Sequence, residues 1–308
     1  MSRLLPAIVL PLDPLTERGV ESAFEIEYET AKSAGFTCLF WGGDDRLRLD
    51  AKSDASVLQR CESALYRGWM LTREGYLELI RAMATRSLRP ATTLDQYLRC
   101  HHFPGWYDRI ADVTVNSIWV EVNGAVDMNM IHDRLAAFGD RPIIVKDFVK
   151  SQKHYWNEAC FIPSAASQPD VERVTHRFIE LQDNQLNGGL VYREFVKLAS
   201  LGVHPRSGMP LSLEYRAFLL NGVMVSLDPY WDGDVGVHEK PDRAWIESIA
   251  QRISSPFLTI DVAQRLDGRW VVMEVGDGQV SGLPNRCTAA EFYSELAAAL
   301  RNPRLGSL

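Results

Sequence analysis

The sequence predicts a mixed α/β protein that contains more than one compact unit. The chain has 308 residues, and a single hydrophobic core stops growing at about 250. The first part alternates strand-like apolar runs with helical patterns, which is how an open α/β sheet begins. The last third is rich in strand-like runs separated by hairpin turns, which indicates antiparallel pairing.

Residues 1–95 are expected to form an N-terminal α/β domain. Gly35 ends a first helical pattern, and Thr72 is a suitable N-cap for a second long helix. Residues 47–54 are polar and show no clear pattern. The expected elements are a strand at 7–10, a helix at 20–34, strands at 37–41 and 63–70, and a helix from 72.

Residues 96–308 are expected to form a second domain, with one subdomain at 96–196 and another at 197–308. The dipeptides Asn221-Gly222 and Asp267-Gly268 each separate two apolar runs, and both readily adopt the positive φ angles of a type I′ turn. The expected strands lie at 117–122, 142–149, 190–196, 214–220, 223–227, 257–265 and 270–275, and the expected helices at 94–98, 128–138 and 170–185.

The charge, the apolar runs and the cysteines bear on the partners and the cellular setting of the protein. The formal net charge is -7, and no run of Lys or Arg makes a basic stripe, which disfavours nucleic acid as a partner. The apolar run near the N-terminus is interrupted by a proline and is far shorter than the ~20 residues of a membrane helix, so we expect no membrane association. The 5 cysteines are scattered without a CxxC pair, which favours a reduced, cytoplasmic setting.

The segment 257–278 is the most informative stretch of the chain. It holds an apolar strand with Asp261, the Asp267-Gly268 turn and a second apolar strand with Glu274. A hairpin centred on that turn pairs Asp261 directly with Glu274, and paired residues on facing strands lie about 5 Å apart. Two carboxylates so close repel each other unless a positive charge lies between them, and a divalent cation with oxygen ligands supplies it.

A structural interpretation of the same pair remains open from these residues alone. Asp261 could end a strand, and Glu274 could form a salt bridge with Arg216 or Arg265. Asp277, in a Gly-Asp-Gly turn after Glu274, favours the metal interpretation because it can reach back to the same place. An aspartate in a turn is also commonly just a turn residue.

Lys146 lies in the middle of an apolar strand, where a buried lysine requires a partner. A nucleotide phosphate is one suitable partner, and an edge-strand lysine that points to water is the alternative. The following loop adds Lys150 and Lys153, which could close over phosphates or belong to an ordinary charged surface. No GxxxxGK[ST] motif is present, so the loop is not a Walker P-loop.

Two further segments could contact a nucleotide. Glu194, Phe195 and Val196 end a strand between the two subdomains, where free backbone groups could pair with an adenine edge while an apolar side chain packs on the ring. Arg216 shares a strand face with Glu214 and could bind a phosphate in a bidentate manner, or form a cross-strand salt bridge.

Taken in order, these elements resemble an ATP-grasp domain. The resemblance is closest to the clade named for the one arginine and two lysines that its members keep, and it spans nearly the whole chain. It implies an ATP-grasp fold, with two α+β subdomains that clamp ATP, preceded by an open α/β pre-ATP-grasp domain. The residues that carry the likeness most clearly are 144–151, IVKDFVKS, and 274–284, EVGDGQVSGLP.

The resemblance also implies roles for the candidate residues. Many ATP-grasp enzymes carry Asn two residues after the metal-binding Glu, whereas this chain has Gly276 there, so Asp277 is expected to substitute as a metal ligand. The implied roles are phosphate binding by Lys146 with Lys150 or Lys153, adenine binding by Glu194, Phe195 and Val196, contact of Arg216 with the transferred phosphate, and binding of Mg²⁺ by Asp261 and Glu274.

The function implied is that of an ATP- and Mg²⁺-dependent ligase. A carboxylate would attack the γ-phosphate of ATP to give an acyl phosphate, which an amine or similar nucleophile converts to an amide, with Lys146 and Arg216 as the catalytic residues. The partners would be ATP and a small carboxylate and amine substrate pair, such as amino acids or peptides. A phosphotransferase and a non-catalytic ATP-binding module are the alternatives.

Overall fold

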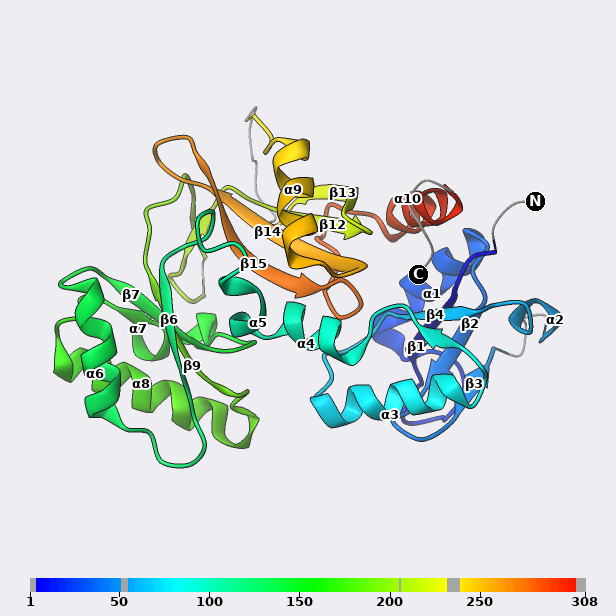
Figure 1. The fold of residues 1–308 in the computed structure, drawn as a ribbon, viewed down its shortest axis with the longest axis horizontal. Coiled ribbons are helices and arrows are strands. Elements are labelled where there is room, and N and C mark those ends of the chain that lie inside the picture. Colours follow the sequence, from blue (N-terminus) through cyan, green and yellow to red (C-terminus); the bar gives the residue numbers. More distant parts are fainter. Residues whose placement is uncertain (1–3, 51–54, 205, 232–238, 303–308) are drawn as a thin grey trace.

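A computed structural model describes residues 4–50, 55–204, 206–231 and 239–302 (Figure 1). Three sheets of four or five strands, together with a two-stranded sheet, form an elongated molecule. The N-terminal sheet lies at one end, the sheet of the central third lies at the other, and the sheet of the last third lies between and above them in this view. Within the described ranges, none of the helices has the length and apolarity needed to cross a membrane.

The first sheet has the strand order β3-β2-β1-β4-β5, and all its pairs are parallel except β2 with β3. The predicted strand, helix and strand at its start are confirmed. The edge strand β3 lies in the polar segment for which no pattern was visible. The bounds are β1 Ala7–Pro11, α1 Glu25–Ser33, β2 Cys38–Trp41, β3 Leu47–Leu49, α2 Ala55–Leu58, β4 Ser63–Tyr66, α3 Arg73–Ala84, β5 Arg89–Pro90, α4 Leu94–His101 and α5 Phe103–Tyr107.

The second sheet is antiparallel, with the order β6-β9-β7-β8. Helices α6 and α8 pack their apolar side chains on it, so the strands are mostly buried. The bounds are β6 Ser117–Glu121, α6 Met128–Leu135, β7 Ile143–Asp147, α7 Trp156–Ala159, β8 Phe161–Ile162, α8 Gln168–Gln182 and β9 Gly189–Glu194, with a short 3-10 helix Lys153–Tyr155 after β7.

The third sheet is also antiparallel, with the order β13-β12-β14-β15, and α9 covers it. The prediction for this third of the chain contained only strands, so it missed α9 and α10, although Asp242 and Thr288 cap them in the usual way. The bounds are β10 Ser200–Val203, β11 Pro210–Ser212, β12 Glu214–Leu220, β13 Val223–Pro229, α9 Arg243–Ile253, β14 Phe257–Gln264, β15 Trp270–Asp277 and α10 Ala289–Arg301.

Helix α10 returns to the first sheet. Phe292 and Leu296 pack in one cluster with Ile8 and Phe36, and Figure 1 shows α10 beside α1. The helix belongs to the range 197–308 that was expected to form the last subdomain, yet its apolar face is buried against the N-terminal sheet. The two ends of the chain are therefore held together by a shared core.

The two predicted hairpins differ in their turns. Leu220 pairs with Val223 across Asn221 and Gly222, whose φ angles of 49° and 78° fit the expected type I′ turn. In the second hairpin the backbone N–H of Arg265 donates to the carbonyl of Arg269, so the turn has three residues, and the expected two-residue turn is wrong.

A β-bulge compensates for the longer turn. Near the turn, Gln264 pairs with Trp270, which is one residue out of the predicted register. The register shifts between Val262 and Asp261, and beyond that point Asp261 faces Glu274. The predicted pairing of the two carboxylates is thus confirmed, although the turn alone would not have produced it.

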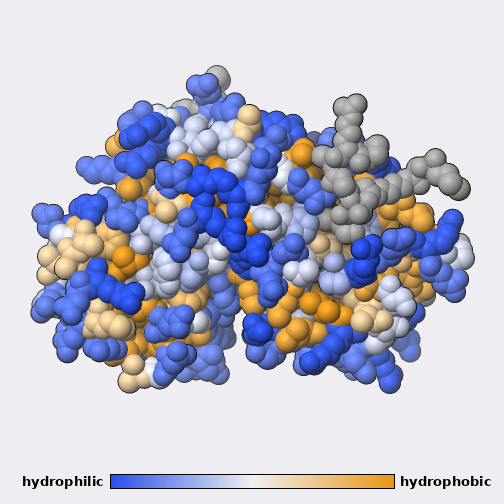
Figure 2. Space-filling view, viewed as in Figure 1, coloured by the Kyte–Doolittle hydropathy of each residue, from blue (hydrophilic) through white to orange (hydrophobic). Residues whose placement is uncertain are grey.

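The surface has a hollow between the part that contains the second sheet and the part that contains the first sheet. Figure 2 shows a mostly hydrophilic face with scattered apolar patches and a notch at its lower edge, between the part that carries α6 and α8 and the part that carries α3. The strands β7, β9, β12, β14 and β15 carry residues that line two cavities.

Candidate functional site

Two neighbouring cavities contain most of the predicted site residues. The first, here called the linker cavity, has a volume of about 390 Å³ and is lined by Ile144, Lys146, Lys153, Glu194–Val196, Glu214 and Met273. The second, here called the carboxylate cavity, has a volume of about 700 Å³ and is lined by Met70, His101, Arg216, Thr259, Asp261 and Ser281. Glu274 lines both cavities, so it marks their junction.

Each of the paired carboxylates at this junction binds a cation of the protein. Arg216 on β12 donates from Nε and Nη2 to the two carboxylate oxygens of Asp261, at 2.8 Å each. The Nζ of Lys146 lies 2.7 Å from Oε1 of Glu274. Both pairs are charge-assisted, and the arginine pair is bidentate, which is the strongest geometry for such a contact.

The electrostatics of the junction favour an ionised Glu274 and a protonated Arg216. Burial acts to raise the pKa of Glu274, but Lys146 and Lys153 lower it to about 2. Burial acts to lower the pKa of Arg216, and Asp261 reverses this and raises it. The junction therefore carries fixed charges of both signs, which is a suitable environment for a charged ligand.

Lys146 occupies an interior position of its sheet. Its strand β7 pairs with β9 on one side and with β8 on the other, and the Lys146 side chain is 7% exposed. The interpretation as an edge-strand lysine that points to water is excluded by this burial. The partner of Lys146 in the structure is Glu274, across 128 residues of sequence.

The loop after β7 places its two lysines differently. Lys153 lines the linker cavity, with Nζ 5.9 Å from the centre of the Trp231 ring. Burial acts to lower the pKa of Lys153, but Glu214 and other acidic groups raise it. Lys150 is exposed, and in the described part of the chain it lines neither cavity. Lys153 is thus better placed than Lys150 to reach a ligand in the linker cavity.

The segment Glu194–Val196 forms one wall of the linker cavity. The carboxylate of Glu194 accepts from Arg141 at 2.7 Å, and the ring of Phe195 packs edge-to-face on Phe161 with centroids 5.2 Å apart. The N–H of Phe195 donates to the carbonyl of Pro142, whereas none of the hydrogen bonds among the described residues uses the N–H of Val196. Val196, which lines this cavity, therefore has a backbone N–H without a hydrogen-bond partner among the described residues.

Glu214 is a further residue of the linker cavity that the sequence did not nominate as a site residue. Burial raises its pKa to about 7, while Lys153 acts to lower it. Its carboxylate accepts a hydrogen bond from Nε1 of Trp231 at 3.0 Å. The sequence signal was the alternation of Glu214 and Arg216 on one strand face, which the structure confirms.

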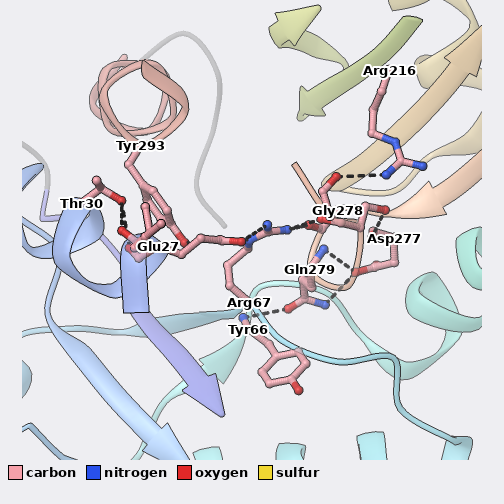
Figure 3. A network of polar contacts seen from close by, with 12 residues as sticks. Glu27, Thr30, Tyr66, Arg67, Arg216, Asp277, Gly278, Gln279 and Tyr293 are labelled. Atoms are coloured by element: carbon pink, nitrogen blue, oxygen red, sulfur yellow. Dashed lines mark hydrogen bonds and ion pairs between the residues drawn. The ribbon is translucent and has the colours of Figure 1, made fainter. Parts of the chain in front are cut away.

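Asp277 borders the carboxylate cavity, but its side chain is turned away from Asp261 and Glu274. It lies an odd number of positions after Glu274, so it points to the other face of β15. Its Oδ1 accepts from the backbone N–H of Gln279 at 2.9 Å and from Nε2 of Gln279 at 3.1 Å, as Figure 3 shows. Among the described residues, no three His, Cys, Asp or Glu side chains form a group that could hold a metal ion.

The stability of the protein is expected to fall between pH 4 and pH 7 because of Asp277. Burial raises the pKa of this carboxyl to about 7 from an ordinary value of 3.8. The native state therefore keeps a proton that the unfolded state has lost, and the free energy of unfolding decreases as the pH rises through that range.

The Asp277→Asn variant tests this expectation, because the amide keeps an acceptor for Gln279 and cannot ionise. Urea denaturation at pH 5 and pH 8 should show that the variant gains stability relative to wild type at the higher pH. A constant difference between the two proteins at both pH values would contradict it.

Comparison with known proteins identifies the family of the chain. A family model for an ATP-grasp domain, family 3 of the clade named for one arginine and two lysines, matches residues 137–296, which is just over half of the chain. The chain belongs to the ATP-grasp family. No curated protein sequence matches it. The predicted membership of this family is thus confirmed.

Solved ATP-grasp structures share the fold over nearly the whole chain. A D-cycloserine synthetase is 17% identical, with a TM-score of 0.57, and covers 97% of this chain and 99% of its own. A RimK-domain ATP-grasp protein from Sphaerobacter thermophilus is 12% identical, with a TM-score of 0.58 and coverages of 95% and 98%. An N5-carboxyaminoimidazole synthetase from Staphylococcus aureus, solved with ADP, is 11% identical, with a TM-score of 0.60 and coverages of 96% and 78%. The predicted fold class is confirmed by these similarities.

Proposed function

We propose that this ATP-grasp protein is a ligase that uses ATP and Mg²⁺ to join a carboxylate to an amine or a related nucleophile. The observation that carries the proposal is the junction of the two cavities. There Asp261 and Glu274 lie side by side, and Lys146, Lys153 and Arg216 surround them with positive charge.

The linker cavity suits the nucleotide. Ile144 and Met273 supply apolar contact for a base, and the N–H of Val196 is a donor for its polar edge. Glu214, which lines the same cavity, is an acceptor suited to sugar hydroxyl groups. The phosphates would then extend toward Lys146 and Lys153, whose ammonium groups are suited to bind them.

The carboxylate pair fits a magnesium ion. Mg²⁺ prefers oxygen ligands and is commonly held by one or two carboxylates together with substrate phosphates. Asp261 and Glu274 would hold the ion, and Asp277 is not retained in this set because its carboxylate points to the other face of β15. When bound, the ion would neutralise charge on the phosphates.

Binding of the nucleotide with its metal would exchange ion-pair partners. The two carboxylates now neutralise Lys146 and Arg216. The metal ion would replace the two cations as the partner of the carboxylates, and the phosphates would replace the carboxylates as the partners of the cations. No buried charge would then be left without a counter-charge, which is costly. We therefore expect the metal and the nucleotide to bind more tightly together than separately.

The carboxylate cavity suits the acceptor substrate. A substrate carboxylate oxygen would attack the γ-phosphorus, and the bond from that phosphorus to the β–γ bridging oxygen would break, which releases ADP. The amine would then attack the acyl carbon, lose a proton and displace phosphate. Arg216 lines this cavity and would stabilise the transferred phosphoryl group, while the other residues act by positioning.

Product analysis tests the function directly. The protein is incubated with ATP, Mg²⁺ and a panel of amino acids and short peptides, and ADP and condensed products are measured by mass. ADP release that depends on a particular pair of substrates supports the ligase. A phosphorylated acceptor without condensation would show a phosphotransferase, and failure to bind ATP would contradict the whole proposal.

The two loop lysines provide a matched pair of variants. Replacement of Lys153 by methionine is expected to weaken ATP binding by about 10- to 100-fold, since a hydrogen bond to a charged group contributes roughly 1.5–3 kcal/mol. The same change at exposed Lys150 is expected to have little effect. Isothermal titration with ATP and Mg²⁺ measures both, and equal losses in the two variants would contradict this assignment of the loop.

A further inference from the structure

The face of the β14–β15 hairpin that carries the two carboxylates continues by one more pair of residues. Thr259 faces Gly276 in the same register in which Asp261 faces Glu274. Residues two apart on a strand share a face, and the bulge lies on the other side of Asp261. Thr259 therefore lies on the carboxylate face, and it lines the carboxylate cavity with Asp261 and Glu274.

A side chain at Gly276 would force Thr259 and Ser281 to move. A Cβ atom there would lie 2.7 Å from Oγ1 of Thr259 and 2.8 Å from Oγ of Ser281. Its φ angle is not positive, so the glycine is required by this contact and not by the backbone conformation. The hydroxyl groups of Thr259 and Ser281 occupy the space into which a longer residue at this position would extend.

The directions of the hydroxyl protons follow from the hydrogen bonds. Ser281 Oγ donates its single proton to the carbonyl of Asp277 at 2.9 Å. The 2.8 Å contact between Thr259 and Ser281 therefore uses the proton of Thr259, with Ser281 Oγ as the acceptor. Oγ1 of Thr259 keeps its lone pairs, and its orientation is fixed by this relay.

We propose that Oγ1 of Thr259 supports the cation site from outside the direct ligands, by accepting a hydrogen bond from a water molecule bound to the cation. This inference rests on the proposed function, because it needs a cation at Asp261 and Glu274. Mg²⁺ usually keeps several of its waters, so it needs oriented acceptors around it as well as direct ligands. This role differs from the direct ligation expected of Asp277, whose carboxylate lies on the other face of β15.

The affinity for Mn²⁺ in the presence of ADP tests the proposal without turnover. Free Mn²⁺ is measured by its electron paramagnetic resonance signal. Thr259→Val, which keeps the shape and removes the hydroxyl, is expected to weaken Mn²⁺ binding by about 10-fold, the lower end of the effect of such outer partners. Thr259→Ser keeps the hydroxyl and is expected to retain most of the affinity. ADP binding in the presence of EDTA should be the same in all three proteins.

Two further variants serve as a control and as a second test of the role of Thr259. Thr175→Val removes another buried hydroxyl, which is bonded to Tyr192 and lines neither cavity, and is expected to leave Mn²⁺ affinity unchanged. Ser281→Ala removes the acceptor that orients Thr259, so a smaller loss of Mn²⁺ affinity is expected, and this variant serves if Thr259→Val does not fold.

The possible outcomes separate this inference from the proposed function. If wild-type protein binds Mn²⁺ with ADP, and both Thr259→Val and Ser281→Ala bind it equally well, the role of Thr259 is overturned while the cation site stands. If the wild-type protein binds no Mn²⁺ with ADP, the proposed function itself fails.

Discussion

Replacement of Arg67 by methionine is expected to lower the free energy of unfolding by about 3–5 kcal/mol, as when one partner of a buried ion pair is removed. Arg67 as a whole residue is 1% exposed. It donates to both carboxylate oxygens of Glu27, at 2.9 and 3.0 Å. The change would leave that carboxylate without its counter-charge in a nearly buried position.

Arg67 also connects the first sheet to the carboxylate cavity. Its Nη1 donates to the carbonyls of Gly278 and Ser281, in the loop that follows β15 (Figure 3). Tyr293 of α10 donates to the same Glu27 carboxylate at 2.9 Å. Loss of Arg67 would therefore free the segment that holds the Ser281 hydroxyl, so Mn²⁺ affinity should fall together with stability.

Chemical denaturation followed by circular dichroism measures the stability loss. Arg89, which pairs with Glu62 on the surface, is the matched control, since both side chains are more than half exposed. Arg89→Met is expected to change stability by no more than about 1 kcal/mol. If Arg67→Met lowers the free energy of unfolding by no more than Arg89→Met does, the hydrogen bonds and the ion pair of Arg67 contribute little to stability.

Replacement of Glu274 by glutamine is expected to reduce Mg²⁺-dependent turnover by on the order of 100- to 1000-fold, the effect of removing one group that stabilises transition-state charge. The amide is neutral and is a poor ligand for a cation. Its loss of charge also leaves Lys146 buried without its partner, which costs stability. Turnover is measured as ADP release with an active substrate pair, and metal binding as Mn²⁺ affinity with ADP.

A double variant separates the two effects of this change. Lys146→Met combined with Glu274→Gln removes both charges of the pair, so stability should recover relative to Glu274→Gln alone, while metal binding stays low. Asp267→Asn, in the exposed turn of the same hairpin, is the control for carboxylate removal. Normal Mn²⁺ affinity in Glu274→Gln would refute the assignment of this residue to the metal site.

Local pattern predicted most of the strands well. The hairpin β12–β13 follows directly from Asn221 and Gly222, because a turn and the strands beside it are set by neighbouring residues. The pairing of Asp261 with Glu274 was predicted correctly, but from a two-residue turn that the structure does not have. The turn at Asp267 and Gly268 shifts the register, and a bulge, which the alternation of residues does not reveal, restores it.

The contacts between distant segments could not be read from the pattern. Gln279 accepts from the backbone N–H of Tyr66 and donates to Tyr76, across more than 200 residues of sequence. Helix α10 packs on the first sheet because its apolar face matches that core, which is a property of the assembled layers. Hydrophobic burial is not directional, so a sequence shows that a face is apolar but not which surface covers it.

The sequence by itself determined the family, the apolar strand that carries Lys146 and the hairpin whose two strands carry Asp261 and Glu274, because these depend on residues close together along the chain. The burial of Lys146 and the bulge that pairs the two carboxylates came from the tertiary structure. Only the tertiary structure decided which cations neutralise the carboxylates and which loop lysine enters the cavity. It also turned Asp277 away from the pair and brought Thr259 and Ser281 together beside Gly276. These outcomes depend on how whole strands and loops pack, and strand packing fixes the direction of each side chain in space.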